Sequence, residues 1–160
     1  MVSALRTLDN DLKGKAFSVE MVDVKVQKVS DVSLPSYAHE GDAGLDIYSA
    51  EDCVLGIGET RAVKTGIKMA IPHGYVGLVW DRSGLAVRNS LHTLAGVIDS
   101  GYRGEISIVM NNLGKADINI SKNMRIAQLL IQPVERVKII ESDSLDETKR
   151  GHGGFGSTGL

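Results

Sequence analysis

The stretch Val63-Lys-Thr-Gly-Ile-Lys-Met-Ala-Ile71 alternates between two kinds of side chain along its whole length. Every second residue, from Val63 through Thr65 and Ile67 to Ile71, is apolar or uncharged, and the residues between them are charged or small. Side chains repeat with a period of two in a β-strand, so alternate residues share one face. The stretch therefore predicts a strand with one face turned toward a core.

The same period recurs along the chain, whereas sustained helical periodicity does not. Further strands are predicted at Val22–Val26, Tyr75–Trp80, Glu105–Met110, Asp117–Ile120, Arg125–Ile131 and Val134–Ile140. Glycine, proline and asparagine separate these segments, which is typical of turns between strands. Only Ser83–Arg88 favours a short helix, with Ser83 as its cap, and Trp80 is expected in the core. The pattern predicts an all-β roll or sandwich with one short helix.

Length and composition predict a single soluble domain. The chain has 160 residues, 42% hydrophobic and 24% charged, with a net charge of −2. This mild acidity argues against a duplex nucleic-acid binder, which usually has a basic face. No apolar run is long enough to span a membrane. Cys53 is the only cysteine, so a disulfide framework is excluded and a cytoplasmic location is expected.

The domain plan has three parts. Residues 21–141 carry the strand pattern and form the expected core. Residues 1–20 form an N-terminal extension whose role the sequence does not indicate. Residues 142–160 are expected to form a polar linker and a flexible, glycine-rich tail.

The tail, Arg150-Gly-His-Gly-Gly-Phe-Gly-Ser-Thr-Gly159, places one of only two phenylalanines among five glycines. Such a stretch favours neither helix nor strand, so the Phe155 ring is free to settle on a ligand. Arg150, Ser157, Thr158 and the unhindered backbone N–H groups suit a phosphate-bearing partner. The alternative is a disordered end with an accidental phenylalanine.

The most informative core segment is Ala95-Gly-Val-Ile-Asp-Ser-Gly-Tyr-Arg-Gly-Glu105. Asp99 ends an apolar run at a turn marked by glycine. Its side chain is therefore expected to be partly buried and held in one orientation. A carboxylate that grips a water there could act as a general base. Tyr102 would present a flat ring beside the same turn. The alternative is a structural aspartate turn with a packing tyrosine.

Three other segments carry polar groups that a plain strand or turn does not need. Asp46 lies in an otherwise apolar stretch and is either a strand-edge acceptor or a group of a ligand site. Arg82, Ser83 and Gly84 occupy a strand-to-helix junction, where N–H groups and a guanidinium favour phosphate; a surface loop is the alternative. Gln128 is the polar member of an apolar row and needs hydrogen-bond partners, structural or functional.

These segments, in this order and with this tail, resemble the five motifs of the homotrimeric deoxyuridine triphosphatase (dUTPase) family. The resemblance runs from about residue 21 to the end, through Ala43–Ser49, Arg82–Ala86, Gly96–Glu105, Arg125–Leu129 and Arg150–Gly159. It implies a distorted jelly-roll (β-clip) protomer and a homotrimer whose sites are shared between chains. It also implies Mg²⁺-dependent hydrolysis of dUTP to dUMP and pyrophosphate, which supplies dUMP and limits uracil in DNA.

The resemblance assigns the core residues as follows. Asp99 would activate the attacking water, and Tyr102 would pack beneath the deoxyribose. The phosphates would be bound by Arg82, Ser83, Gly84 and Gln128. Asp46 would lie near the water shell of a Mg²⁺ ion held mainly by the substrate phosphates.

Base and lid residues follow from the same resemblance. Phe155 would stack on uracil, while Arg150, Gly156, Ser157 and Thr158 would surround the terminal phosphates. Uracil would be read by backbone groups of the hairpin Thr93–Ile98, which includes Val97, and by the facing strand near Ser107.

The chain departs from the family pattern at two positions. Asp81 precedes Arg82 where many relatives have proline, and strand alternation should point its side chain away from that of Arg82. Thr93 stands where some relatives have asparagine. Two other functions stay open: deamination of dCTP on a similar roll, and a binding or regulatory trimer without turnover.

Overall fold

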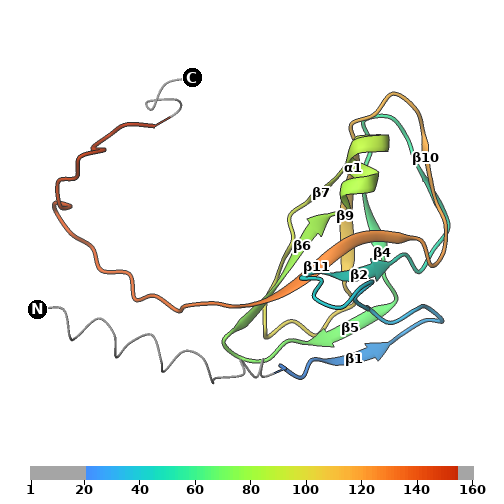
Figure 1. Ribbon diagram of the computed structural model, residues 1–160, viewed down its shortest axis with the longest axis horizontal. Helices are drawn as coiled ribbons and strands as arrows, with labels where there is room; N and C mark the ends of the chain where they lie inside the picture. The colour runs from blue at the N-terminus through green and yellow to red at the C-terminus, as the bar shows by residue number, and fades with distance from the viewer. Residues whose placement is uncertain (1–20, 155–160) are drawn as a thin grey trace, which may run out of the picture.

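A computed structural model of the protein describes residues 21–154. Within them the chain forms eleven strands and one helix, which gives the all-β fold with a single short helix that the sequence predicts (Figure 1). The elements are β1 (Lys25–Lys28), β2 (Leu45–Tyr48), β3 (Cys53–Leu55), β4 (Thr60–Lys64), β5 (Ile67–Ala70), β6 (Tyr75–Asp81), α1 (Ser83–Asn89), β7 (Leu91–Leu94), β8 (Val97–Ile98), β9 (Ser107–Asn112), β10 (Ile118–Ile120) and β11 (Arg125–Pro133).

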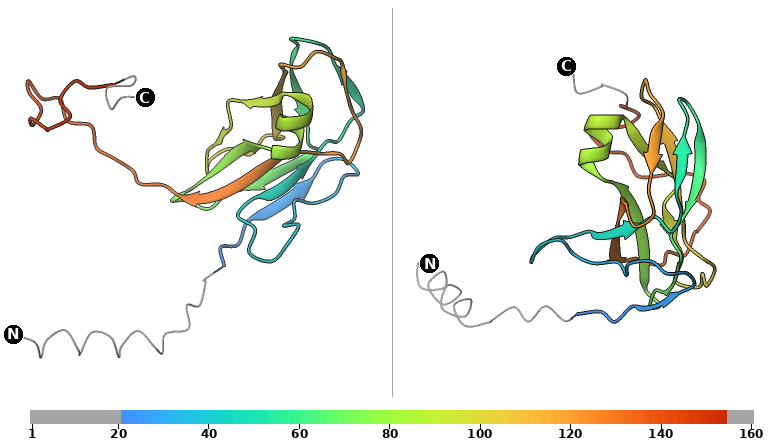
Figure 2. Two further views of the ribbon diagram at one scale, coloured as in Figure 1. Left: turned by 45° about the horizontal axis from the view of Figure 1, so that its top comes forward. Right: turned by 90° about the vertical axis from the view of Figure 1, so that its right-hand side faces the viewer.

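Two larger sheets and two short ladders make up a jelly-roll-like body (Figure 2). The longest strand, β11, lies between β2 and β6, and β8 pairs with the other edge of β6. The second sheet has the order β4-β9-β7, and β1-β5 and β3-β10 form the ladders. All these pairs are antiparallel. The hairpin from β7 to β8 therefore passes from one large sheet to the other.

The alternating stretch 63–71 contributes the predicted face to the core, but it is two strands rather than one. Val63, Thr65 and Ile67 are each at most 2% exposed, and Ile71 is 2% exposed. Gly66 has a φ of +67° and bends the chain there, so β4 pairs with β9 and β5 pairs with β1. A side-chain period reports which face is buried and does not report such a bend, because the buried face continues through it.

The prediction of a strand at Val134–Ile140 is wrong. After β11 the chain leaves the body and runs away from it without regular structure (Figure 1). Its apolar side chains stay exposed, at 76% for Val137 and 84% for Ile139. Alternation in sequence does not supply a neighbouring strand to receive the hydrogen bonds.

Two smaller expectations are also wrong. Trp80 is 59% exposed on the single chain and does not pack in the core. Helix α1 forms where predicted, but its N-cap is Arg82, without a side-chain capping bond, and Ser83 is the first helical residue. No helix within residues 21–154 is long and apolar enough to cross a membrane.

Candidate active site

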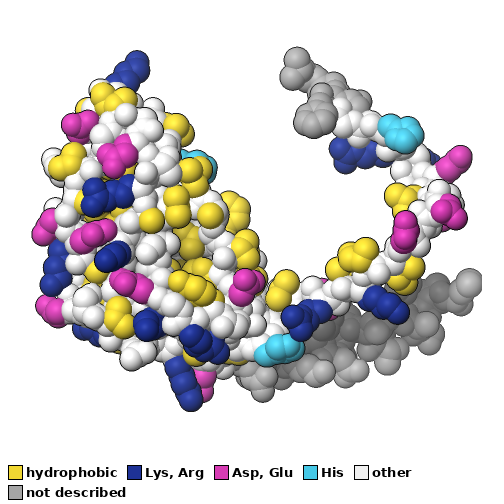
Figure 3. Space-filling model, turned by 180° about the vertical axis from the view of Figure 1, so that it is seen from behind, with side chains coloured by type: hydrophobic (Ala, Val, Ile, Leu, Met, Phe, Trp, Pro, Cys, Tyr) yellow, Lys and Arg dark blue, Asp and Glu magenta, His cyan; other side chains and the backbone are white. Residues whose placement is uncertain are grey.

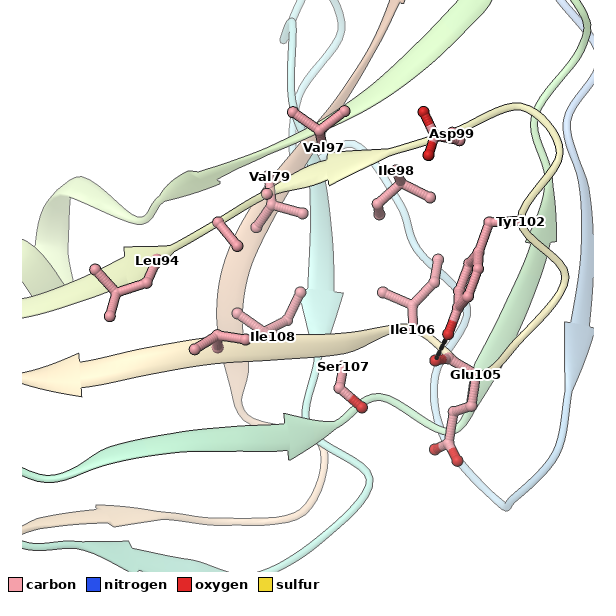
Figure 4. Close-up of a pocket in the computed structure, with 13 residues that line it drawn as sticks. Val79, Leu94, Val97, Ile98, Asp99, Tyr102, Glu105, Ile106, Ser107 and Ile108 are labelled. Atoms are coloured by element: carbon pink, nitrogen blue, oxygen red, sulfur yellow. Dashed lines mark hydrogen bonds between the residues drawn. The ribbon is translucent and has the colours of Figure 1, made fainter.

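A pocket of about 280 Å³ opens between β8 and β9 and contains five of the predicted site residues. Val97, Ile98 and Asp99 come from β8 and its end, Tyr102 from the following turn, and Ser107 from the start of β9. Figure 4 shows Ile98 pointing between the two strands, toward Ile106 and Ile108, and the Tyr102 ring standing at one end. The pocket thus combines a mainly apolar lining with two acidic residues, Asp99 and Glu105.

Gly96 allows the backbone of the β7–β8 hairpin to lie close to β6. Ala95 and Gly96 both have positive φ, of 61° and 117°, and the amide of Val79 donates to the carbonyl of Gly96 at 2.8 Å. A Cβ atom at Gly96 would lie 2.9 Å from the carbonyl oxygen of Val79. Only glycine fits this close approach, so the hairpin backbone itself forms one wall of the pocket.

The turn that carries Asp99 and Tyr102 is held by its own hydrogen bonds. The Tyr102 amide donates to the Asp99 carbonyl at 3.0 Å, and the Tyr102 hydroxyl donates to the Glu105 carbonyl at 2.9 Å. The Arg103 guanidinium donates to the carbonyls of Ser100 and Tyr102 at 2.7 Å. These bonds fix where the Tyr102 ring stands.

The Asp99 side chain is exposed, so the expectation that it would be partly buried is wrong. The apolar run before it ends in β8, which is only two residues long and lies at the edge of its sheet. Asp99 follows this short edge strand directly, and no other segment within residues 21–154 covers its side chain.

A second cluster gathers around the buried carboxylate of Asp46 in β2. Its Oδ1 accepts from Nε of Arg82 at 3.1 Å, and its Oδ2 accepts from Nη1 of Arg125 at 3.1 Å. The Asp46 side chain is only 4% exposed, whereas those of Arg82 and Arg125 are 26% and 47% exposed. The buried carboxylate of Asp46 thus orients the partly exposed guanidinium groups of Arg82 and Arg125.

The other predicted phosphate residues lie on the elements next to this cluster. Gln128 of β11 pairs with Asp46 on one side and with Trp80 on the other, and its side chain is half-buried. Ser83 and Gly84 form the first turn of α1, where Ser83 is exposed. A Cβ atom at Gly84 would lie 2.9 Å from Nη2 of Arg88. These residues do not line the pocket that holds Asp99.

Asp81 connects the end of β6 to β7. Its Oδ1 accepts from both the amide and the hydroxyl of Thr93, at 2.5 and 2.7 Å, and its Oδ2 lies 2.7 Å from Nδ1 of His92. Burial raises the pKa of Asp81, but the hydrogen bonds from His92 and Thr93 outweigh burial and hold that pKa below its ordinary value. Asp81 and Arg82 therefore bind different elements, as strand alternation predicts. Thr93 faces Asp81 and does not line the pocket of Asp99.

The predicted lid residues lie apart from both clusters or outside the described part of the chain. Arg150 is exposed, and its Nε donates to the carbonyl of Gly153 at 2.9 Å. Phe155, Gly156, Ser157 and Thr158 lie outside the described residues.

No site role is predicted from the sequence for Arg125, His92 or the apolar pocket residues Val79, Ile106 and Ile108. Arg125 is the only charged residue of β11, which is a visible signal for a charge held by a partner. His92 carried no such signal, because its partner Asp81 lies eleven residues away on another strand. Among the described residues, His, Cys, Asp and Glu side chains do not gather in threes that could hold a metal ion.

Comparisons of the sequence with known proteins identify its family. The sequence model of the dUTPase family matches residues 30–159. A deoxyuridine 5'-triphosphate nucleotidohydrolase of Clostridium acetobutylicum is 48% identical over 143 residues, which cover 88% of this chain and 99% of the relative. One from Mycolicibacterium gilvum is 51% identical over 137 residues, covering 81% of this chain and 89% of the relative.

Solved structures give the same answer. The Staphylococcus bacteriophage 80alpha dUTPase with dUPNHPP superimposes with a TM-score of 0.83 at 31% identity, covering 88% of this chain and 100% of that chain. A mutant dUTPase from phage phi11 of S. aureus, described with a structural Mg(II) ion, has a TM-score of 0.73 at 28% identity, covering 79% and 100%. The chain therefore belongs to the dUTPase family of hydrolases.

Proposed function

We propose that this protein hydrolyses dUTP to dUMP and pyrophosphate, with water activated by Asp99. The observation that carries the proposal is the pocket between β8 and β9, which places an exposed carboxylate and an aromatic ring at the rim of an apolar cavity. The relatives named as deoxyuridine 5'-triphosphate nucleotidohydrolases supply the substrate.

Uracil and deoxyribose occupy the pocket. Its walls are the apolar side chains of β8 and β9, which suit a flat base, and the close-set hairpin backbone offers amide and carbonyl groups for the base edge. The Tyr102 ring, held by Glu105 through its hydroxyl, packs against the sugar and leaves little room for a 2′-hydroxyl group. Selection against ribose then depends on shape.

The phosphates are bound by Arg82 with Ser83, Gly84 and Gln128. A guanidinium that is already held by Asp46 loses little freedom when it binds a phosphate oxygen, so it supports the reacting geometry at low entropic cost. The first turn of α1 presents backbone N–H groups beside it. These donors stabilise charge that develops on the α-phosphate.

Asp99 acts as the general base. Its carboxylate accepts a proton from a water molecule that attacks the α-phosphorus in line with the departing pyrophosphate. Solvent access to Asp99 supports this role, because the water must reach the carboxylate before the site closes. The tail, with Phe155 over the base and Arg150, Gly156, Ser157 and Thr158 around the phosphates, closes the site and excludes bulk water.

The donor set fits a Mg²⁺ ion that depends on the substrate for most of its ligands. Mg²⁺ commonly binds through one or two carboxylates and the phosphates of a nucleotide, and the described residues offer no carboxylate cage. Bound there, the ion would neutralise phosphate charge and orient the chain of phosphates. Asp46 would contribute through water, although both its oxygens already accept from arginine.

A homotrimer would complete the site. Asp99 and the Arg82 cluster lie on separate parts of one chain, and the segment after β11 runs away from both (Figure 1). Figure 3 shows apolar side chains exposed on the side of the body that faces the tail, and Trp80 and Val97 are 59% and 69% exposed. Covering such side chains with neighbouring copies would bring the Asp99 pocket of one chain to the Arg82 cluster of another.

The decisive assay is pyrophosphate release from dUTP by the purified protein. UTP, dTTP and dCTP are assayed separately as control substrates. We expect fast release from dUTP only, and loss of release when a chelator removes Mg²⁺. Ammonia release from dCTP would instead indicate a deaminase. Binding of dUTP without release of any product would indicate a regulatory protein.

A further inference from the structure

We propose that Asp81 is a positioning residue that ties the base-binding hairpin, residues 91–98, to the phosphate-binding turn, Arg82–Gly84. Through this tie Asp81 sets how well the enzyme discriminates between pyrimidine bases. The proposal rests on the function proposed above and extends it to a residue that contacts neither base nor phosphate.

Asp81 takes the place of a missing neighbour strand. Strand β7 is the edge strand of the sheet β4-β9-β7, so its outer edge has no strand to pair with. The Thr93 amide on that edge donates to Oδ1 of Asp81, and the Thr93 hydroxyl donates to the same atom. His92 binds the other oxygen at 2.7 Å. One side chain therefore engages two successive residues of β7.

This side chain also joins the two large sheets. Strand β6, which ends at Asp81, belongs to the sheet β2-β11-β6-β8, and β7 belongs to the other sheet (Figure 1). The other end of the hairpin is tied to β6 by the bond from the Val79 amide to the Gly96 carbonyl and by pairing of β8 with β6. Asp81 supplies the tie at the β7 end.

Both halves of the site lie within a few residues of this tie. Leu94, which follows Thr93, begins the run of hairpin residues that lines the pocket. Arg82, which follows Asp81, is the N-cap of α1 and is bound by Asp46. Consecutive Cα atoms lie about 3.8 Å apart, so a shift at either end of the tie reaches the pocket or the phosphate donors directly.

The bonds are strong enough for this role. A carboxylate acceptor forms shorter hydrogen bonds, about twice as strong as neutral ones. Only 28% of the Asp81 side chain is exposed, so water competes weakly for its oxygens. The lowered pKa of Asp81 agrees with a carboxylate that stays charged under these bonds.

The test compares Asp81→Ala and Asp81→Asn with a matched control, Asp52→Ala. The Asp52 carboxylate also accepts a backbone amide from a distant segment, that of Lys122 at 2.8 Å, but it lines none of the site. Steady-state kinetics with dUTP, dCTP and dTTP would be normalised to the fraction of folded protein. Hydrogen exchange of peptides covering 82–86 and 91–98 would be followed in parallel, and it needs no turnover.

We expect Asp81→Ala to raise KM for dUTP about tenfold and to reduce the preference for dUTP over dCTP by a similar factor, because three hydrogen bonds are lost. The kcat of bound substrate should change less, within about threefold. Exchange should rise in both peptides together. Asp81→Asn should restore most of each property, because its oxygen still accepts from Thr93 and its amide can donate to His92. The control should match the wild type.

Unchanged KM and base preference in Asp81→Ala, or faster exchange in only one of the two peptides, would overturn the proposal. If Asp81→Ala does not fold, Thr93→Val keeps the backbone bond, removes the hydroxyl donor and should give a smaller shift in the same direction; no shift would then overturn it. Lack of dUTP turnover in the wild type would contradict the proposed function separately. The exchange data would still show whether Asp81 links the hairpin to the phosphate-binding turn.

Discussion

Nε of Arg82 lies 3.1 Å from Oδ1 of Asp46, a carboxylate whose side chain is 4% exposed. The guanidinium reaches the surface, while its partner lies beneath it in the β2–β11 ladder. Arg125 binds the other oxygen of the same carboxylate. The arginine is therefore oriented by the core and does not sample the conformations of a free surface side chain.

Asp46→Asn should lower both stability and activity. The amide keeps the shape but replaces one acceptor with a donor that faces an arginine. We expect the free energy of unfolding to fall by about 2 kcal/mol, because hydrogen bonds to charged groups contribute about 1.5–3 kcal/mol. The kcat/KM for dUTP should fall at least about tenfold as Arg82 loses its orientation.

Asp31→Asn is the matched control for that variant. Asp31 pairs with Lys122 at 3.4 Å, but its side chain is 94% exposed, and exposed pairs contribute little. Urea unfolding and steady-state kinetics on both variants would separate the two cases. Equal effects would show that burial of Asp46 does not matter.

The lowered pKa of Asp81 gives a pH dependence of stability. Because its folded pKa lies below the ordinary value of 3.8, the carboxylate contributes stability that is present above that value and is lost as pH falls through the folded pKa. The difference in unfolding free energy between wild type and Asp81→Asn should therefore shrink as pH falls from 5 to 3. Urea unfolding at one protein concentration would measure it, and a difference that grows would be incompatible with this assignment.

Gly96→Ala should disturb the hairpin wall of the pocket. Its φ of +117° is unfavourable for alanine, and the added Cβ would meet the Val79 carbonyl oxygen at 2.9 Å. We expect a loss of about 2 kcal/mol or more in unfolding free energy and a raised KM for dUTP. Gly101→Ala is the control, because a Cβ there meets no atom within 4 Å. It should unfold within about 0.5 kcal/mol of the wild type.

Tail closure should be visible by limited proteolysis. Lys149 and Arg150 are exposed and lie outside regular structure, so trypsin should cut there readily in the absence of nucleotide. Ordering about ten residues costs on the order of 10 kcal/mol, so closure requires both base and phosphate contacts. A nonhydrolysable dUTP analogue with Mg²⁺ should slow cleavage, and Phe155→Ala should remove that protection. Equal cleavage with and without the analogue would contradict a lid.

The sequence predicts the buried faces better than it predicts the elements that bear them. The alternate residues from Val63 to Ile71 are all buried as predicted, although Gly66 divides the strand. Val134–Ile140 shows a similar pattern and remains exposed, because no neighbouring strand of the described chain receives it. Periodicity records which side chains avoid water, while strand pairing depends on contacts between distant segments.

For the candidate site, the ordered motifs predict residues but not their hydrogen-bond partners. Asp99, Tyr102 and Ser107 meet at one pocket as the motifs imply. The pairing of Asp46 with Arg82 and Arg125, and that of Asp81 with His92 and Thr93, could not be read from spacing. Each pair joins residues from different segments of the chain, and strand register is set by the fold as a whole. The exposure of Asp99 and Trp80 also depends on which distant segments cover them, so the local sequence does not predict it.

The most direct test of the central claim is pyrophosphate release from dUTP by the wild type and by Asp99→Asn, with affinity for a nonhydrolysable dUTP analogue measured in parallel. Loss of a general base is expected to lower kcat by about 10²–10⁴-fold, and the uncharged amide should leave affinity within about threefold of the wild type. Pyrophosphate release by Asp99→Asn at the wild-type rate would contradict the account.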